Sequence, residues 1–369
     1  MRQGPMGVAL VGAGAISAQY LENLTRMPDL EVLAVADLDR ERAAARAAEY
    51  GVPTGAAVEE VLADPDVELV VNLTIPAAHM EVALAALRAG KHVWSEKPFA
   101  VDRAGSRAVL AEAESLGLRA AGAPDTFLGD AVQTARRLVE EGRIGEPLTA
   151  LTLFQAAGPE AWHPNPEFFY APGGGPLFDI GPYYLTSLVQ LLGPVARVAA
   201  SASTARPTRV IASGPRAGTE FPVHVATHLG ALIEFENGTS AQSTFSFQSP
   251  QRRVGFFEVG GSDATLVLAD PNGFDGELAI ITREGREVVE THAAVGRGHG
   301  VLELARAIRA GRPERASGEL AAHVVDIMAS IDEAAVGGGF VDVASSASPG
   351  PVLPPGWNPL AATLLDSPS

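Results

Sequence analysis

The sequence predicts an α/β protein in two parts: a parallel sheet covered by helices, then a domain built on an antiparallel sheet. Short apolar runs alternate with Ala-rich helical patterns as far as Ala123. Such alternation is typical of parallel strands joined by right-handed crossovers. Beyond that residue the segments become longer and alternate between apolar and polar positions, which is typical of antiparallel strands.

The first part, residues 1–123, contains four expected strands, each a short apolar run. They lie at 6–11 (MGVALV), 31–36 (EVLAVA), 68–73 (ELVVNL) and 91–95 (KHVWS). The helical patterns lie near 15–27, 39–50, 77–90 and 102–117. The apolar start MGVALVGAGAIS lacks a small-residue cleavage pattern, so we interpret it as strand, glycine turn and helix rather than as a signal segment.

The second part, 124–345, is expected to form an antiparallel sheet with helices after it. Its strand patterns lie at 147–156, 194–203, 222–236, 239–248, 254–259, 264–269 and 277–282, and its late helical patterns at 301–311 and 318–336. Asn237-Gly238 separates two of these strands, and this dipeptide favours a tight hairpin. The remaining segment, 346–369, is Pro-rich and is expected to be an extended tail.

Composition excludes several classes of function. The chain has 369 residues, 47% of them apolar, and a formal net charge of -17, so a large core is expected and binding to nucleic acid is disfavoured. No apolar run is long enough to suggest a membrane span. Cysteine is absent, which excludes disulfides and thiolate catalysis and agrees with a cytoplasmic location.

The turn after the first strand reads Gly12-Ala13-Gly14-Ala15-Ile16-Ser17 and matches a dinucleotide-binding motif with Ser in place of the third glycine. The first two glycines permit a tight turn and the approach of a pyrophosphate to a helix N-terminus. Asp37 ends the second strand, where an acid binds ribose hydroxyls and repels a 2'-phosphate. We therefore expect NAD, with NADP possible because Arg40 and Arg42 are near. The alternative is that Asp37 only caps the helix near Arg40.

Lysine occurs only at positions 91 and 97, although the chain has 27 Lys plus Arg. Lys97 lies in Glu96-Lys97-Pro98, at the carboxyl end of an expected strand, the edge where open α/β sheets bind ligands. Unlike Arg, lysine offers a compact amine whose pKa shifts on burial. Lys97 is therefore a candidate for chemistry, and the alternative is a surface lysine paired with Glu96.

A second candidate group lies in residues 173–185, GGGPLFDIGPYYL, where a flexible turn leads into a helix. Asp179 and Tyr183 are four residues apart, so in a helix they lie on one face. This spacing brings a carboxylate and a phenol together. The alternative is that Asp179 is only an N-cap and Tyr183 only a packing residue.

Four motifs together resemble the Gfo/Idh/MocA family, the group of glucose-fructose oxidoreductase and inositol dehydrogenase. They are GAGAIS (12–17), LTIPAAH (73–79), GKHVWSEKP (90–98) and GGGPLFDIGPYYL (173–185), and the resemblance extends from residue 6 to about 340. It implies an N-terminal Rossmann domain and a C-terminal α/β domain with a large open, mainly antiparallel sheet. The outer face of that sheet commonly makes subunit contacts, so a homodimer or homotetramer is expected.

The resemblance also implies the chemistry: members oxidise or reduce a carbon of a sugar or polyol with a nicotinamide cofactor. The cofactor-binding residues that it implies are Gly12, Gly14, Ala15, Ile16, Asp37, Thr74, Ile75, Pro76, His79, Glu96 and Lys97. By analogy Lys97 contacts the substrate and the proton-transfer group, and Asp179 orients one of them. Many members have His where this chain has Tyr183, so Tyr183 is the expected proton carrier, and a neighbouring ammonium would lower its pKa.

Other candidates are less specific. Trp162 and His163 precede the glycine-rich turn and are candidates for a wall that faces the sugar, and Asp125 follows the first domain as a further substrate-binding candidate; each has a packing or capping role as its alternative. His163 is also the second candidate for the base. No histidines show metal-ligand spacing, so no metal is expected.

Two other functions remain open from the sequence alone. One is a glycosidase that retains NAD and oxidises its substrate only transiently, as a branch of the family does. The other is a non-catalytic NAD(P)-binding sensor, which would be expected to lack the set of Lys97, Asp179 and Tyr183.

Overall fold

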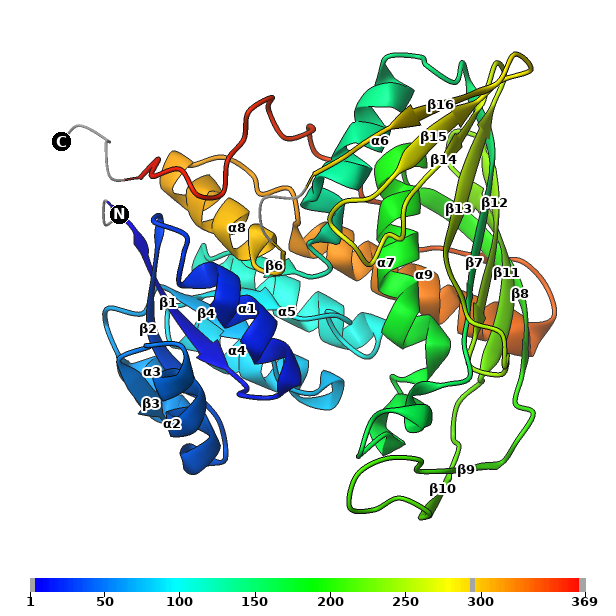
Figure 1. Cartoon of the computed structure of the whole chain (residues 1–369). Helices are drawn as coiled ribbons and strands as arrows, with labels where there is room; N and C mark the ends of the chain where they lie inside the picture. Colours follow the sequence, from blue (N-terminus) through cyan, green and yellow to red (C-terminus); the bar gives the residue numbers. More distant parts are fainter. Residues whose placement is uncertain (1–3, 293–295, 365–369) are drawn as a thin grey trace. The chain divides into compact units, whose positions relative to one another are not determined.

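The structure is a computed structural model that describes residues 4–292 and 296–364, and the chain divides into two compact units (Figure 1). Within the described residues, the first unit draws on Met1–Gly129, Ala293–Ala322 and Gly350–Ser369, and the second on Asp130–His292 and His323–Pro349. The sequence predicts a linear division at 123 and 345. In the structure the chain instead returns to the first unit twice, in the segment that ends at Ala322 and in the segment that begins at Gly350.

The first unit is built on a parallel sheet. In the part of the chain that the structure describes, its strands are β1 (Met6–Val11), β2 (Leu30–Ala36), β3 (Thr54–Ala56), β4 (Leu69–Asn72), β5 (His92–Ser95) and β6 (Ala120–Gly122). Their order is β3-β2-β1-β4-β5-β6, and every pair is parallel. Successive strands are added on one side of β1 as far as β3 and on its other side from β4 to β6. The strand order therefore changes direction between β1 and β4, and doubly wound sheets bind dinucleotides at such a place.

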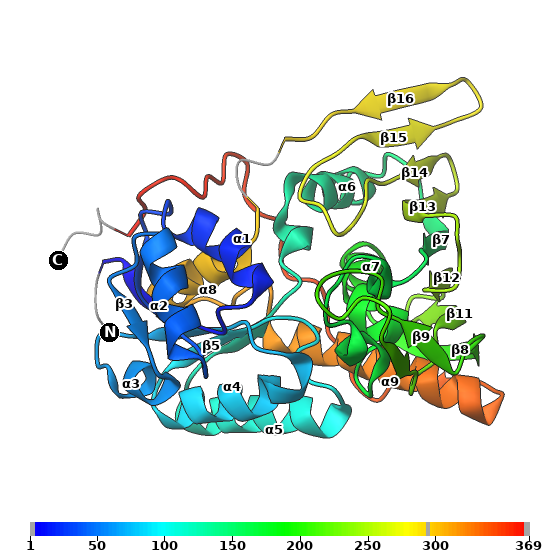
Figure 2. The same cartoon turned by 60° about the horizontal axis from the view of Figure 1, so that its bottom comes forward.

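Helices cover both faces of this sheet. They are α1 (Ala15–Leu24), α2 (Arg40–Glu49), α3 (Val58–Ala63), α4 (His79–Arg88), α5 (Arg103–Leu116) and α8 (His299–Ala310), with the short turns η1 (Pro76–Ala78) and η2 (Thr126–Leu128). Figure 2 shows α4 and α5 on one side of the sheet and α1 and α8 on the other. The strands are buried on both faces, which explains their continuous apolar sequences.

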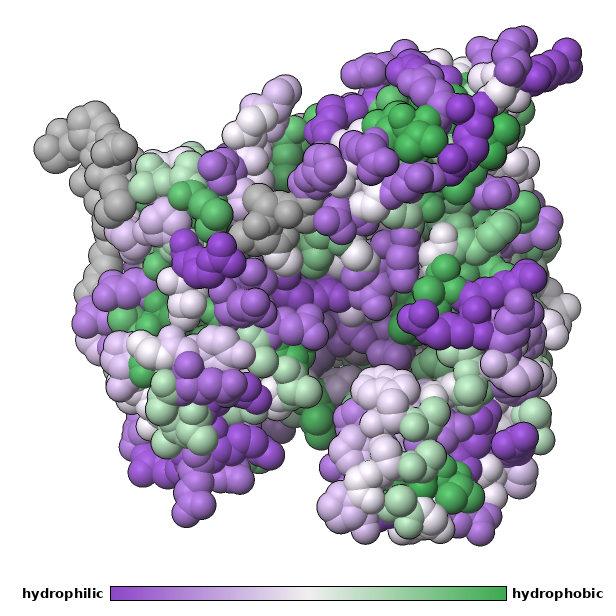
Figure 3. All heavy atoms as spheres, viewed as in Figure 1, coloured by the Kyte–Doolittle hydropathy of each residue, from purple (hydrophilic) through white to green (hydrophobic). Residues whose placement is uncertain are grey.

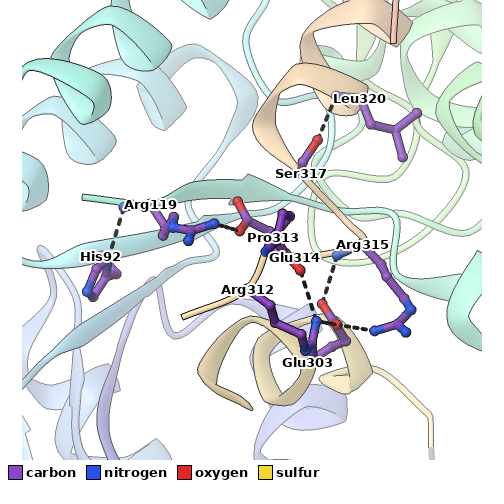
Figure 4. A network of polar contacts seen from close by, with 9 residues as sticks. All are labelled: His92, Arg119, Glu303, Arg312, Pro313, Glu314, Arg315, Ser317 and Leu320. Carbon is purple, nitrogen blue, oxygen red and sulfur yellow. Dashed lines mark hydrogen bonds and ion pairs between the residues drawn. The ribbon is translucent and has the colours of Figure 1, made fainter. Parts of the chain in front are cut away.

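Ion pairs hold the segment that follows α8, and one of them connects it to Arg119 beside the sheet. Glu303 of α8 is fully buried and pairs with Arg312 at 2.6 Å and Arg315 at 2.7 Å, as Figure 4 shows. Arg119, which precedes β6, pairs with Glu314 and donates its backbone N–H to Nδ1 of His92 at 3.0 Å. A buried carboxylate is costly unless it is paired and hydrogen-bonded, so Arg312 and Arg315 compensate the charge of Glu303 and tie the segment after α8 to that helix.

The described part of the tail, 346–364, contains no helix or strand, yet it is attached to the first unit at several points. Asp29, fully buried, accepts hydrogen bonds from the backbone of Thr363 and Leu364 at 2.8 Å and pairs with Arg306 of α8 at 2.7 Å. Arg306 also donates to the carbonyls of Asn358 and Ala361. The tail is therefore part of the first unit's packing.

The second unit is built on a larger, mixed sheet. Among the described residues its strands are β7 (Pro147–Gln155), β8 (Val195–Ser203), β11 (His228–Phe235), β12 (Ser240–Ser246), β13 (Arg253–Gly261), β14 (Thr265–Val267), β15 (Leu278–Ile281), β16 (Arg286–Val289) and β17 (Val341–Asp342). Their order is β16-β15-β14-β13-β7-β12-β11-β8-β17. All neighbours are antiparallel except β12 and β7, which are parallel. A mainly antiparallel sheet is thus confirmed.

One face of this sheet packs against α7 (Gly175–Leu192). Tyr184 of this helix stacks on Phe257 of β13, meets Phe245 of β12 edge-on, and accepts a hydrogen bond from the backbone N–H of Gly255 at 2.8 Å. The helices α6 (Asp130–Glu140) and α9 (Gly318–Gly337) and the ribbon of β9 (Thr208–Val210) and β10 (Glu220–Pro222) complete the elements named in Figure 1. No helix of the described chain is long and apolar enough to span a membrane.

Most expected elements are present, and the differences have physical reasons. The Asn237-Gly238 hairpin is confirmed as the turn between β11 and β12, with Gly238 at φ +87°. The single strand expected at 222–236 is wrong, because β10 ends at Pro222 and β11 begins at His228. The elements β3, α3, α6 and β16 are additional. β3, α3 and β16 are too short to show a clear apolar period, whereas α6 is amphipathic, with Val132, Ala135 and Leu138 buried, and was missed despite its period.

Candidate active site

The glycine turn after β1 has the geometry of a phosphate-binding loop. Gly12 has φ +109°, and a Cβ there would lie 2.6 Å from the carbonyl oxygen of Leu73, so only glycine fits. Gly14 is the N-cap of α1, makes no side-chain capping bond, and has open space where a Cβ would be. Ser17, at the third position of the motif, is buried and donates to the carbonyl of Gly14. The first turn of α1 thus presents backbone N–H groups beside an open cradle, which fits a pyrophosphate.

Asp37 lies just past β2, beside this turn. Its carboxylate accepts hydrogen bonds from the backbone N–H of Ala13 at 2.8 Å and from Arg42 at 2.5 Å. Burial alone would raise the pKa of Asp37, but the bonds from Arg42, Asp39 and Ala13 outweigh it and hold the pKa below its usual value. The alternative capping role is wrong, because Asp39 caps α2 by accepting from Glu41 and Arg42.

The loop after β4 carries Thr74, Ile75 and Pro76. The Thr74 hydroxyl donates to the side-chain oxygen of Asn72 at 2.7 Å, which fixes the start of the loop. Ile75 is 59% exposed, although it follows a buried strand. Because β4 is next to β1, this loop and the glycine turn follow neighbouring strands at one edge of the sheet.

His79 connects this loop to the lysine turn instead of facing solvent. It is buried, with Nδ1 2.7 Å from the carbonyl oxygen of Pro98 and Nε2 3.0 Å from that of Thr74. Burial lowers the pKa of His79. A neutral imidazole has one N–H, so at neutral pH only one of the two carbonyls receives a hydrogen bond at a time.

Lys97 lies in a bend directly after β5, as the sequence predicts. Its backbone N–H donates to Oε2 of Glu96 at 2.9 Å, and Oε1 of Glu96 accepts from the hydroxyl of Tyr20 at 2.8 Å. The other lysine, Lys91, is buried and donates from Nζ to the carbonyl of Asp64. Of the two lysines, Lys97 alone follows the carboxyl end of a strand.

Asp125 is fully buried in the first unit. One carboxylate oxygen accepts from the backbone N–H groups of Gly298 at 2.8 Å and Gly300 at 3.2 Å, and the other is 3.5 Å from Arg297. Burial raises the pKa of this carboxyl group, and the charge of Arg297 opposes that shift. Asp125 therefore caps the N-terminus of α8, the role that the sequence left open as its alternative.

In the second unit, Asp179 and Tyr183 both lie inside α7, one turn apart. The helix begins at Gly175 with Gly174 as its N-cap, so the alternative that Asp179 is the N-cap is wrong. Tyr184 attaches the helix to the sheet. Because neighbouring residues of a helix point about 100° apart, Tyr183 and Asp179 share a face that differs from the one held by Tyr184.

Trp162 and His163 lie in an aromatic cluster that precedes α7. The ring of His163 meets Trp162, Phe168 and Phe169 edge-on at 5.3 to 5.5 Å, and Trp162 is 65% exposed. Nδ1 of His163 accepts a hydrogen bond from the backbone N–H of Asn165 at 3.1 Å. Burial lowers the pKa of His163, and the charges of Glu167 and Asp179 oppose that shift, so Asp179 lies within electrostatic reach of the cluster.

A buried ion pair supports this cluster and was not expected from the sequence. Arg209 of β9 pairs with Glu160 at 2.6 Å, donates to the carbonyl of Phe247, and lies over the ring of Tyr170. The hydroxyl of Tyr170 donates to Glu160. Arg209 is 49 positions from Glu160 and 38 from Phe247, and no motif relates them, so only the fold brings them together. No group of three or more His, Cys, Asp or Glu side chains that could hold a metal occurs among the described residues.

The comparisons with known proteins agree with both units. Residues 6–122 match the family profile described as oxidoreductase family, NAD-binding Rossmann fold, and residues 132–267 match the GFO/IDH/MocA C-terminal domain. The chain is 30% identical over 265 residues to 1,5-anhydro-D-fructose reductase of Ensifer adhaerens, which covers 70% of this chain and 74% of that protein. It is 29% identical over 274 residues to trans-1,2-dihydrobenzene-1,2-diol dehydrogenase of Bos taurus, covering 73% and 76%.

A solved structure shows the same fold. Levoglucosan dehydrogenase in complex with NADH and L-sorbose superposes with a TM-score of 0.81 over 92% of this chain and 99% of that chain, at 24% identity. At that level of identity the similarity establishes the arrangement of strands and helices.

Proposed function

Because the chain belongs to the GFO/IDH/MocA family of NAD-binding oxidoreductases, we propose that it transfers a hydride between nicotinamide and a carbinol or carbonyl carbon of a sugar or polyol. The curated relatives reported above are named as a reductase of an anhydro-sugar and a dehydrogenase of a dihydrodiol, both of which act on carbons bearing oxygen. The observation that carries the proposal is the pair Asp179 and Tyr183 on one face of α7, in a chain that also has Lys97 directly after β5.

NAD fits the residues of the first unit. Gly12, Gly14, Ala15 and Ile16 would hold the pyrophosphate, since the first turn of α1 has no side-chain cap. Asp37 would accept from the ribose hydroxyls, and Thr74, Ile75, Pro76 and Glu96 would line the rest of the cofactor site. His79 lies between the carbonyls of Thr74 and Pro98 and bonds one of them at a time. When bound, the nicotinamide accepts or supplies the hydride.

The proton of the reacting hydroxyl is assigned to Tyr183. A phenol positioned by a helix can act as general base or acid, and Asp179 one turn earlier orients the substrate or the phenol. Lys97 donates to the reacting oxygen and stabilises the charge that develops there. The amine of lysine is a compact charge with rotatable donors, which suits an oxygen whose charge changes during the reaction.

His163 is a less suitable base for a structural reason. A backbone N–H can only donate, so the bond from Asn165 makes Nδ1 of His163 an acceptor and leaves the ring proton of the neutral form on Nε2. To accept a proton, His163 must lose this bond or shift its tautomer. We therefore assign Trp162 and His163 to the substrate-facing wall. Asp125 has no such role, because one of its oxygens caps α8 and the other pairs with Arg297.

The proposal includes an assembly of two or more copies through the second unit's sheet. Leu151, Leu232 and Phe256 are 42%, 36% and 40% exposed. The strand register places them on the face opposite α7. Figure 3, in the view of Figure 1, looks along the sheet rather than onto this face, and shows apolar residues among hydrophilic ones where β15 and β16 lie. An exposed apolar sheet face is typical of a subunit interface. Leu232→Asp should then convert the oligomer to monomer in size-exclusion chromatography; an unchanged elution volume contradicts this assembly.

A panel of sugars and polyols, followed at the NADH absorbance with product analysis, tests the function. A dehydrogenase produces one NADH for each oxidised product. Release of a sugar from a glycoside without net NADH would instead show the NAD-retaining glycosidase. Binding of NAD with no product on any substrate would favour the non-catalytic sensor and contradict the proposal.

A further inference from the structure

A buried tyrosine hydroxyl links the nucleotide-binding helix to the lysine turn. Tyr20 lies on α1, whose first turn follows the glycine loop, and its side chain is fully buried. The hydroxyl is 3.2 Å from Nε1 of Trp94 and 2.8 Å from Oε1 of Glu96. Trp94 is the third residue of β5, and Glu96 directly precedes Lys97. All four residues belong to the first unit.

The direction of each hydrogen bond in this group is determined by chemistry. An indole nitrogen can only donate, so the Tyr20 oxygen accepts from Trp94 and its single proton goes to Glu96. Oε2 of Glu96 accepts the backbone N–H of Lys97 at 2.9 Å. Burial raises the pKa of Tyr20, and the charges of Glu96 and Asp125 raise it further. The phenol therefore stays protonated and remains a donor to Glu96 across the working pH range.

We propose that Tyr20 is a positioning residue: its hydroxyl holds the carboxylate of Glu96 so that Lys97 keeps the orientation needed for turnover. This inference rests on the proposed role of Lys97. The two carboxylate oxygens of Glu96 have different donors: Oε1 accepts from the hydroxyl of Tyr20, and Oε2 accepts from the backbone N–H of Lys97. Losing the Tyr20 donor frees the carboxylate to rotate, and rotation releases the backbone of Lys97.

The arrangement also connects cofactor binding to the lysine turn. The residues that would hold the pyrophosphate begin α1, and Tyr20 is on the same rigid helix. Anything that fixes the start of this helix also restricts the position of the hydroxyl that holds Glu96. Tyr20 itself is buried away from solvent, so its effect on the reaction passes through Glu96 and Lys97.

Tyr20→Phe removes only the hydroxyl. We expect kcat to fall about tenfold, comparable to losing one hydrogen bond to a charged group. The dissociation constant for NAD, measured by titration, should stay within about threefold because the phosphate cradle is intact. A kcat within about twofold of wild type overturns the inference, since so small a change in activation free energy shows that the hydroxyl does not position Lys97 for the reaction.

A spectroscopic experiment tests the same link without relying on activity. Lysine occurs only at 91 and 97, so protein labelled with ¹³C at lysine Cε gives two lysine signals, which Lys97→Arg assigns. Tyr20→Phe should shift the Lys97 signal and leave that of Lys91 in place. Unchanged signals for both lysines overturn the inference.

The two experiments separate this inference from the proposed function. If Lys97→Ala keeps normal turnover, the catalytic role of Lys97 fails and the predicted loss of kcat in Tyr20→Phe fails with it. If Lys97→Ala is inactive while Tyr20→Phe resembles wild type in both kcat and the lysine spectrum, only the positioning role of Tyr20 fails.

Discussion

The carboxylate of Asp37 accepts a hydrogen bond from the backbone N–H of Ala13 at 2.8 Å, which ties the end of β2 to the glycine turn after β1. The same carboxylate pairs with Arg42. The acid expected to face the ribose thus also holds the loop expected to face the phosphates, and it neutralises the arginine nearest to it.

The Asp37–Arg42 pair predicts the cofactor preference. NAD should bind more tightly than NADP, because a 2'-phosphate would meet the charge of Asp37. Asp37→Ser should narrow the difference between the dissociation constants for NAD and NADP. It removes the repulsion between the carboxylate and the 2'-phosphate, and it releases Arg42 to bind that phosphate. The Asp37→Ser/Arg42→Ala double variant is the control, and it should regain less NADP affinity. Equal dissociation constants for the two cofactors in the wild-type protein would contradict the prediction.

Lys97→Ala should lower kcat by about 10²-fold or more, a typical loss when a group acting on the reacting oxygen is removed. NAD affinity should change by only a few-fold. The matched control is Lys91→Ala, which removes the buried lysine that donates to the carbonyl of Asp64; it should lower the melting temperature and leave the kcat of the folded enzyme unchanged. Near-normal turnover of Lys97→Ala would show that the amine takes no part in the reaction.

Tyr183→Phe should lower kcat by about 10²-fold or more with little effect on unfolding or on NAD binding. Tyr184→Phe is its counterpart: it removes the hydroxyl that accepts from Gly255 and should lower stability more than turnover. The pH profile of kcat/KM should lose its basic inflection in Tyr183→Phe, and Lys97→Arg should move it. An inflection that survives in Tyr183→Phe but disappears in His163→Asn transfers the role to His163.

Gly300→Ala should destabilise the first unit although alanine favours helices. A Cβ at Gly300 would lie 1.9 Å from the ring of Trp94, and overpacking of this kind costs about 1–3 kcal/mol. Gly337→Ala in α9 is the control, because nothing lies within 4 Å of its Cβ position. In urea unfolding, Gly300→Ala should lower the free energy of unfolding, whereas Gly337→Ala should leave it unchanged or raise it. Equal stability of Gly300→Ala and wild type would refute the contact.

His92, which is partly buried, and His299, which is buried, predict loss of stability in acid. Burial, with the charge of Arg119, lowers the pKa of His92 to about 4, and burial lowers the pKa of His299 to about 4 as well. Both values lie below the unfolded value of about 6.5, so the unfolded chain binds more protons between these limits. Their contribution to stability is complete above about pH 6.5 and is lost as the pH falls towards 4.

The test for His92 uses its hydrogen bond. Nδ1 accepts from the backbone N–H of Arg119, and protonation removes that acceptor. His92→Asn can accept the same bond through its amide oxygen and does not titrate. The difference in unfolding free energy between wild type and variant should therefore move in favour of the variant from pH 7 to pH 5. A constant difference would show that His92 does not sense pH.

Much of the fold followed from local sequence. The strands β1, β2, β4 and β5 with the helices between and after them, the Asn237-Gly238 hairpin and the turn carrying Lys97 were expected and are present, whereas β3 and α3 were not expected. Short apolar runs and turn dipeptides encode these features locally. The parallel pairing of β12 with β7 was not expected, because which strands become neighbours depends on contacts that no local pattern records.

The candidate site was also predictable from the sequence only where its residues are close together along the chain. The sequence placed Asp179 and Tyr183 on one helical face, a property of their spacing alone. The support of Glu96 by Tyr20 was missed, since the two residues are 76 positions apart and no periodicity relates them. For Asp125, the sequence left open the capping role, but its partners Gly298 and Gly300 come from a segment far along the chain.

The return of the chain to the first unit has a consequence for synthesis. Asp29 and Asp125 are synthesised before the strands β7 to β16 of the second unit, whereas their partners follow those strands: Thr363, Leu364 and Arg306 for Asp29, and Gly298 for Asp125. Until then both carboxylates and the surface that α8 covers remain open to water. The first unit therefore completes its packing only after residues 130–292 of the second unit have been synthesised, and a chain cut before residue 350 would lack the partners of Asp29 at Thr363 and Leu364.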